Sequence, residues 1–203
     1  MQKNSIIAVL LVLVLWLAGL GAAAQFAKFA VPFSYVRAQY PDAGTEIGWL
    51  LTLISALGAV LGMTAGVFVA RVGFGKTVVM ALVIGGVLSL WQASLPRLVP
   101  MLISRVVEGL AHVRMVVAAP TLIAQIASDR YRGMSMTLWS TFFGVSFALV
   151  AWLGLPYLEE NGLGALLAAH GLYMLVLAVI VGLALYGTKR TKTLVAGPRG
   201  LRS

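Results

Sequence analysis

Six apolar stretches, each long enough to cross a lipid bilayer, constrain the fold of this chain more than any other feature. A spanning helix needs about 20 mostly apolar residues. Lipid offers no hydrogen-bond partner to an open backbone, and the short alternating segments of a membrane β-barrel do not occur. The sequence therefore predicts an all-α, polytopic membrane protein with six transmembrane helices. We expect these helices over residues 6–36, 47–70, 77–93, 98–127, 134–157 and 163–186.

The composition agrees with a chain that is solvated by lipid. Hydrophobic residues make up 61% of the sequence and charged residues 10%, whereas soluble proteins average about 45–50% apolar and about 25% charged residues. The first apolar run follows Lys3, as in a secretory signal. A run of about 20 residues exceeds the core of a signal peptide, and further spans follow, so we expect a retained first helix.

The residues on which most enzymes and metal proteins depend are scarce. The chain has no cysteine, which excludes disulfides, thiol catalysis and cysteine-based metal sites. Its two histidines, His112 and His170, lie far apart along the chain. No phosphate-binding loop, dinucleotide fingerprint or serine–histidine–acid arrangement occurs. We therefore expect neither an enzyme nor an ATP-driven pump, and no metal or cofactor.

Lysine and arginine are distributed unequally between the two sides of the predicted bundle. With the N-terminus inside, ten fall on the inner side and only Arg37 and Arg97 on the outer side. Because basic residues favour cytoplasmic loops, we expect a bacterial-type inner (plasma) membrane protein with both termini cytoplasmic. Topology explains most of the net charge of +9, so nucleic acid is not an expected partner. The inner residues are Lys3, Arg71, Lys76, Arg130, Arg132, Lys189, Arg190, Lys192, Arg199 and Arg202.

The stretch GVFVARVGFGKTVV, residues 66–79, interrupts the apolar signal between the second and third spans. Its glycines permit a tight reversal of the chain. Arg71 and Lys76 would remain in water and face the anionic inner leaflet. We interpret the stretch as a short inner loop, an interpretation that by itself fits many membrane proteins.

The spacing within this loop resembles a signature of the major facilitator superfamily. The matching residues are Gly66, Phe68, Arg71 and Gly73, followed by Lys76, while Ala70 replaces the usual aspartate. The resemblance implies that Gly66, Arg71, Gly73 and Lys76 help to close the inner face of a transporter. Without this carboxylate the loop cannot form the charge-based contact that usually closes the inner face in the family.

A second signature lies on the fourth predicted span. Arg105, Glu108 and Gly109 resemble the family's Arg-x-x-x-Gly pattern, which is associated with proton coupling and substrate binding. The nearest resemblance is to the cyanate-transporter-like bacterial branch. A full member has about twelve helices in two related halves. The resemblance therefore implies an N-terminal half, with residues 1–187 as the bundle and 188–203 as a basic cytoplasmic tail that begins the central loop.

This resemblance implies a half of a secondary transporter that moves a small, anionic solute by alternating access. Its partners would be the bilayer, the solute, a coupling proton, and a second six-helix half or a second copy of the chain. Two alternatives to a transporter half stay open. The first is a membrane scaffold or regulatory half-protein that does not itself transport. The second is a six-span transporter that works as a homodimer.

Polar residues inside the fourth span form a candidate site. Arg105, Glu108 and His112 are spaced i, i+3 and i+7, which places them on one helix face. Ionisable groups inside a bilayer usually face a cavity or the bundle interior. These three side chains are candidates to hold an anion, carry a proton, or both. The structural alternative is an ion pair between Arg105 and Glu108 that only joins helices.

Gln25 and Lys28 share one face of the first span. The family resemblance places the first and fourth helices beside the central cavity, where a lysine would favour an anionic substrate. Alternatively, residues 6–25 already cross about 30 Å, so that Lys28 reaches the outer interface and snorkels to water.

Other polar and small residues have less defined roles. Arg114 lies about 180° from Arg105 on an ideal helix and so cannot share its face. We interpret His170 as a packed, hydrogen-bonded histidine. Gly58, Gly62 and Gly66 repeat every four residues, which permits close approach of another helix. That helix belongs either to the same bundle or to the second half.

Overall fold

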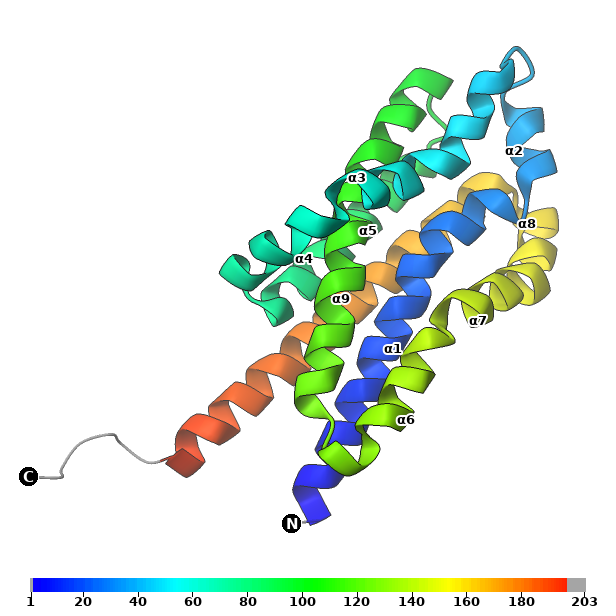
Figure 1. The fold of residues 1–203 in the computed structure, drawn as a ribbon. Helices are drawn as coiled ribbons and strands as arrows, with labels where there is room; N and C mark the ends of the chain where they lie inside the picture. Colours follow the sequence, from blue (N-terminus) through cyan, green and yellow to red (C-terminus); the bar gives the residue numbers. More distant parts are fainter. Residues whose placement is uncertain (1, 197–203) are drawn as a thin grey trace, which may run out of the picture.

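A computed structural model describes the backbone of residues 2–196 and the side chains of residues 6–187, and all regular secondary structure in this part of the chain is helical. Six of its helical segments are long and apolar enough to span a membrane, which confirms the predicted class. Figure 1 shows the helices as one elongated bundle in which α1 begins and α9 ends towards the same end. The elements are α1 (Gln2–Ala30), α2 (Phe33–Gln39), η1 (Thr45–Gly48), α3 (Trp49–Val72), α4 (Phe74–Gln92), α5 (Leu98–Ile126), α6 (Asp129–Ser140), α7 (Phe142–Leu149), η2 (Val150–Gly154), α8 (Leu155–Asn161) and α9 (Leu163–Ala196).

The first span is shorter than predicted. We expected one helix over residues 6–36, but α1 ends at Ala30 and a separate short helix, α2, begins at Phe33. Pro32 lies between them with φ −89° and ψ 37°. Proline lacks a backbone N–H and restricts the residue before it, so the helix ends there.

The fifth span is longer than predicted and is not one regular helix. It runs over Asp129–Asn161 rather than over residues 134–157. Thr141 interrupts it, and its hydroxyl donates a hydrogen bond to the Leu138 carbonyl. The π-helical turn η2 follows α7 and ends at Gly154, two residues before Pro156. A proline removes one helical hydrogen bond, and π-turns inside helices absorb such irregularities.

The connection between α3 and α4 is a single residue. Gly73 alone separates the two helices, with φ 94° and ψ 136°. This left-handed conformation favours glycine, because a Cβ atom would be strained there. The prediction of an inner loop over residues 66–79 is therefore wrong in extent: Gly66 and Arg71 belong to α3, and Lys76 belongs to α4.

The sixth span agrees with the prediction of 163–186, because the candidate span covers Leu163–Gly187. The helix itself continues beyond the span, since α9 extends to Ala196, within the expected basic tail over 188–203. Residues 197–203 lie outside the described part of the chain.

Helix α4 packs most extensively on α9, and α5 packs on both α3 and α4. The contact between α4 and α9 depends on two glycines. A Cβ atom on Gly171 would lie 2.8 Å from the Gly86 carbonyl oxygen and 2.9 Å from the Leu90 amide nitrogen. Only glycine lets the two backbones approach so closely.

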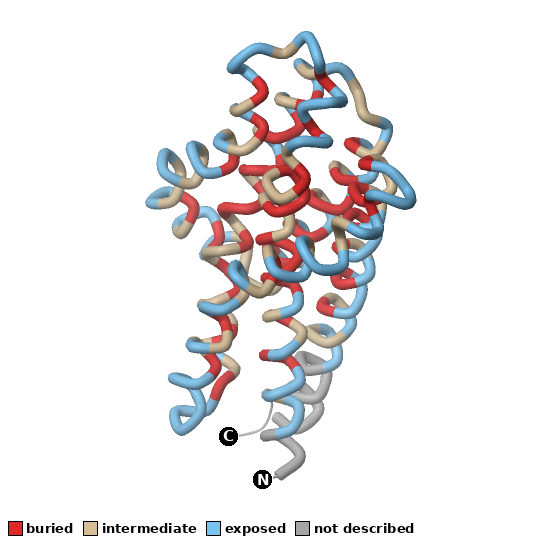
Figure 2. The backbone as a smooth tube through the Cα atoms, turned by 90° about the vertical axis from the view of Figure 1, so that its right-hand side faces the viewer, coloured by how far each residue is buried: buried red, intermediate tan, exposed pale blue. Residues whose placement is uncertain are grey.

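Buried residues gather along the middle of the bundle (Figure 2). Many large apolar side chains are exposed on its outside. Met63 is 93% exposed, Trp152 75% and Val60 74%. Such a surface fits a lipid environment and would be unusual on a soluble monomer.

The buried apolar residues form two clusters. The smaller one includes Phe29, Leu50, Met101 and Leu167, whereas the larger one includes the next apolar positions along the same helices towards the Gly73 end. Between the two clusters, α1, α4, α5 and α9 each carry polar residues instead.

Helix α3 is the least buried of the first four spans. A Cβ atom on Gly62 or Gly66 would meet no other atom within 4 Å in the described chain, and one on Gly58 would meet only Val113 at 3.8 Å. Packing inside this bundle therefore does not account for the row of glycines. Contact of Gly58 and Gly62 with a second half stays a prediction.

Candidate functional site

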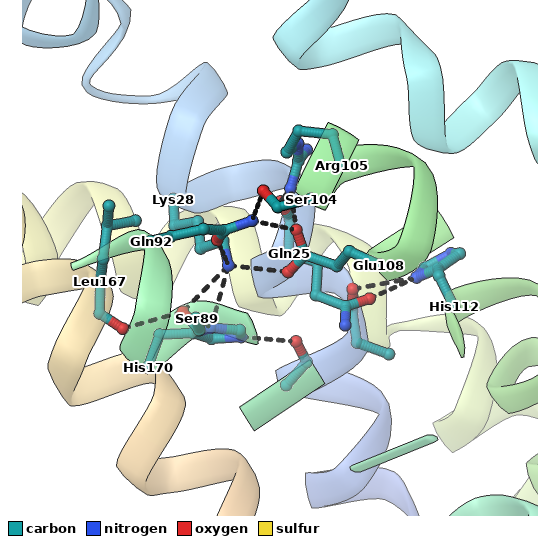
Figure 3. Close-up of polar contacts among 12 residues, drawn as sticks. Gln25, Lys28, Ser89, Gln92, Ser104, Arg105, Glu108, His112, Leu167 and His170 are labelled. Atoms are coloured by element: carbon teal, nitrogen blue, oxygen red, sulfur yellow. Dashed lines mark hydrogen bonds and ion pairs between the residues drawn. The ribbon is translucent and has the colours of Figure 1, made fainter. Parts of the chain in front are cut away.

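Four helices meet at a buried polar layer between the two apolar clusters (Figure 3). All of its side chains are 8% exposed or less. The layer brings together all five residues predicted from the sequence for the substrate and proton pathway. We define the polar layer as Gln25 and Lys28 of α1, Ser89 and Gln92 of α4, Ser104, Arg105, Glu108 and His112 of α5, and His170 of α9.

The Glu108 carboxylate lies at the centre of the layer. Its Oε1 accepts a hydrogen bond from Lys28 Nζ at 2.7 Å. Its Oε2 accepts from Arg105 Nη1 at 2.5 Å and from Gln92 Nε2 at 3.0 Å. The ion pair between Arg105 and Glu108 that the sequence suggested is therefore present, and Lys28 is a second cation on the same carboxylate.

Lys28 lies inside the bundle and not at its surface. Its Nζ also donates to Gln92 Oε1 at 2.7 Å and to Ser89 Oγ at 3.0 Å, so all three ammonium protons have an acceptor. The side chain is 1% exposed. The alternative that Lys28 snorkels to the outer interface is wrong, because α4 and α5 supply acceptors that a purely apolar bundle would lack.

The Arg105 guanidinium is held by the backbone of two neighbouring helices. Its Nε donates to the Leu50 carbonyl and its Nη1 to the Gln25 carbonyl, both at 2.8 Å. Its Cζ lies 4.6 Å from the centre of the Phe29 ring. The remaining nitrogen, Nη2, is buried and makes no hydrogen bond within the described part of the chain.

The charges of the polar layer do not cancel. Lys28 and Arg105 are two cations, and Glu108 is the one acid in contact with them. Each buried ion without a partner is costly, and opposite charge offsets that cost only when the groups are close and hydrogen-bonded. The layer therefore has an excess of positive charge and one unused guanidinium donor.

His112 occupies a separate branch of the layer. Its Nδ1 lies 3.0 Å from Gln25 Oε1 and 3.2 Å from the Ala22 carbonyl oxygen. The carbonyl is an acceptor, so Nδ1 donates and carries the proton. No hydrogen bond joins His112 to Glu108 among the described residues, although four positions separate them on α5.

The sequence did not predict Ser89, Gln92 and Ser104, and it predicted His170 only as a packed or hydrogen-bonded residue, which the structure confirms, and not as part of the layer. His170 Nδ1 lies 2.9 Å from Ser89 Oγ and 3.5 Å from Lys28 Nζ, so this histidine is part of the ionic network. Its Nε2 donates to the Gly21 carbonyl at 3.0 Å. One sequence signal could have indicated part of this network: Ser89 and Gln92 are polar residues spaced i, i+3 in an otherwise apolar helix.

The other predicted residues lie away from the polar layer. Arg71, Gly73 and Lys76 lie at the turn between α3 and α4. Arg114 is half-buried further along α5, and its Cζ stacks 4.7 Å from the centre of the Phe68 ring. Within the described residues, no group of three or more histidine or acidic side chains is placed to hold a metal ion.

A six-span bundle with paired ionisable groups in its interior defines a class, the polytopic membrane proteins of transporter type. The model of the family described as Major Facilitator Superfamily matches residues 7–202. The chain belongs to the major facilitator superfamily, and its helical bundle is consistent with half of that fold. No curated protein and no solved structure matches the chain.

Proposed function

We propose that this chain is the N-terminal half of a secondary transporter that moves a small, anionic solute across a bacterial-type inner membrane. Membership of the superfamily supports transport of the major facilitator type. The observation that carries the finer proposal is the polar layer, in which Lys28 and Arg105 share the single carboxylate of Glu108 at 0–1% exposure. An excess of buried positive charge favours a negatively charged solute over a cation.

The same geometry suggests how a proton would be coupled to the solute. A proton on Glu108 would leave Lys28 and Arg105 without their counter-ion. The two cations would then favour an anion, and loss of the proton would restore the ion pairs and release it. In this proposal Gln25 and His112 line the pathway within the layer, and they are joined to Arg105 through the Gln25 backbone carbonyl, which accepts from the guanidinium.

Alternating access requires a second body against which this bundle moves. A second six-helix half or a second copy of the chain would supply it. The glycine row of α3 supports a contact of this kind, because in the described bundle a Cβ atom on Gly62 would meet nothing within 4 Å and one on Gly58 would meet only Val113 at 3.8 Å. The turn at Gly73, with Gly66, Arg71 and Lys76, would act at the inner side as a gate.

The proposed orientation places both termini in the cytoplasm and can be tested with single cysteines, because the chain has none of its own. Gln39→Cys and Ser128→Cys replace exposed residues at opposite ends of the bundle and leave the basic residues unchanged. We expect a membrane-impermeant maleimide to label Gln39→Cys in intact cells. Ser128→Cys should react only after permeabilisation, and the reverse pattern would contradict the orientation.

Transport is tested by uptake into proteoliposomes that contain the chain in the assembly isolated from its native membrane. The probes are chloride, nitrate, formate and cyanate, the last because resemblance to the cyanate-transporter-like branch stays a prediction. Arg105→Ala and Glu108→Gln are expected to lower the initial rate at least tenfold, since each removes a charge-assisted contact of about 1.5–3 kcal/mol. Glu160→Gln, an exposed acid, is the matched control.

The outcomes separate the alternatives. If Arg105→Ala and Glu108→Gln both transport at the wild-type rate per folded protein, the polar layer does not have the role proposed for it. Absence of uptake for every probe, with a folded assembly, would favour a scaffold or regulatory half-protein. Uptake by an assembly containing only this chain would identify a homodimeric transporter.

A further inference from the structure

A second cationic site lies between α3 and α5, away from the polar layer. A cavity of about 240 Å³ opens there, lined by Thr64 and Phe68 of α3 and by Leu110, Val113 and Arg114 of α5. At about 30 Å³ per water molecule, this space is large enough for a group of several heavy atoms. The proposed function uses none of these residues.

Arg114 is the cation of this cavity and lacks a counter-ion. Its guanidinium stacks on the Phe68 ring, with Cζ 4.7 Å from the ring centre, which leaves the N–H edges free. Within the described residues, Arg114 makes no hydrogen bond and no ion pair. By contrast, Lys28 and Arg105, the two fully buried basic residues of the described chain, both contact Glu108.

The acids of the chain do not neutralise Arg114. Glu108 lies in the polar layer, and Asp129 pairs with Arg132 at 2.7 Å. Asp42 and Glu46 precede α3, whereas the cavity lies towards the end of that helix. Glu159 and Glu160 lie in α8, and no ion pair between them and Arg114 occurs in the described chain. An anion that pairs with Arg114 therefore comes from outside the described chain.

The position of the cavity indicates the source of that anion. Thr64, Phe68 and Arg71 are spaced i, i+4 and i+7, so they share one face of α3. Phe68 is four residues and Thr64 eight residues from Val72, which corresponds to about 6 and 12 Å along the helix. The cavity thus lies within the leaflet on the Gly73 side. Arg71, on the same face of α3, is exposed, and so is Lys76 in the first turn of α4.

We propose that this cavity binds the phosphate-bearing headgroup of an anionic lipid, with Arg114 as the main cation. Arg71 and Lys76, which are exposed on the Gly73 side of the bundle, attract the same lipid by their charge. The apolar walls from Leu110 and Val113 suit the start of an acyl chain, which a soluble anion lacks. The proposed orientation places this leaflet on the cytoplasmic side, where anionic lipids are abundant and basic pockets between helices bind their headgroups.

The test measures lipid binding to the detergent-purified chain by native mass spectrometry. The probes are phosphatidylglycerol, phosphatidylcholine and inorganic phosphate. We expect phosphatidylglycerol to bind about tenfold more tightly than phosphatidylcholine, and Arg114→Gln to remove that preference, since a charge-assisted pair contributes about one factor of ten or more. Arg97→Gln, an exposed arginine at the other end of α5, is the matched control and should bind as wild type.

Two further variants cover the case in which Arg114→Gln does not fold. Arg114→Lys retains the charge and should retain part of the preference for phosphatidylglycerol. Thr64→Leu narrows the cavity at an exposed position and should weaken phosphatidylglycerol binding. Equal affinity for both lipids, wild-type binding by Arg114→Gln or Thr64→Leu, or displacement of phosphatidylglycerol by millimolar inorganic phosphate would each overturn the proposal.

Discussion

Replacing Glu108 with glutamine is expected to destabilise the bundle more than any other single change in the polar layer. The substitution leaves Lys28 and Arg105 buried, close together and without an acid. Removing one partner of a buried ion pair costs about 3–5 kcal/mol, because an uncompensated charge stays in the interior. We expect a large fall in the apparent melting temperature of the detergent-purified protein. A fluorescence or light-scattering assay measures this temperature.

Whether unpaired positive charge causes this loss of stability is tested by removing Lys28 together with Glu108. Lys28→Met alone leaves Arg105 and Glu108 as a balanced pair and should cost less than Glu108→Gln. The double variant should be more stable than the sum of the two single changes predicts, because it no longer buries two unpaired cations. Additive losses, or a Glu108→Gln variant as stable as Glu160→Gln, would show that the charges in the layer are not coupled.

The second large effect is expected at the contact between α4 and α9. In Gly171→Ala the added methyl group would lie 2.8 Å from the Gly86 carbonyl oxygen and 2.9 Å from the Leu90 amide nitrogen. Backbone atoms cannot give way as a flexible side chain does, so the helices must separate. Overpacking of this kind costs about 1–3 kcal/mol and occasionally more.

Gly144→Ala is the matched control for this change. A Cβ atom there meets nothing within 4 Å in the described chain, and alanine favours a helix over glycine by about 1 kcal/mol. We therefore expect Gly171→Ala to lower the melting temperature and Gly144→Ala to leave it unchanged or raise it. Equal melting temperatures would mean that α4 and α9 tolerate a wider spacing than the structure shows.

The change at Gly171 should also reach the polar layer. Ser89 lies between Gly86 and Leu90 on α4, and it contacts both His170 and Lys28. Pushing α4 away from α9 lengthens the distance between Ser89 and His170. The uptake assay should consequently show a lower rate for Gly171→Ala than its folded fraction alone explains.

The number of spans and the helical class could be predicted because lipid imposes both on an apolar chain. The ends and breaks of the spans could not. Pro32 is visible in the sequence, but an apolar run continues past it, so hydropathy alone extends the first span to residue 36. Thr141 and the turn η2 interrupt a similarly continuous run in the fifth span.

The candidate site could be predicted in part for a related reason. The spacing of Arg105, Glu108 and His112 on one helix is a local property, and their shared face follows from it. The partner of Lys28 is not local, because Glu108 lies 80 positions away along the chain. His170 was assigned to packing since no periodic pattern relates α9 to α4 and α1 across the bundle.

The single-residue turn at Gly73 has a mechanical consequence. Because one residue joins them, α3 and α4 cannot move far apart at that end. Helix α3 carries the glycine row, and α4 is held against α9 through Gly86 and Gly171. If a second half packs on the glycine row, as we propose, a displacement of α3 would be passed through Gly73 to α4, which carries Ser89 and Gln92.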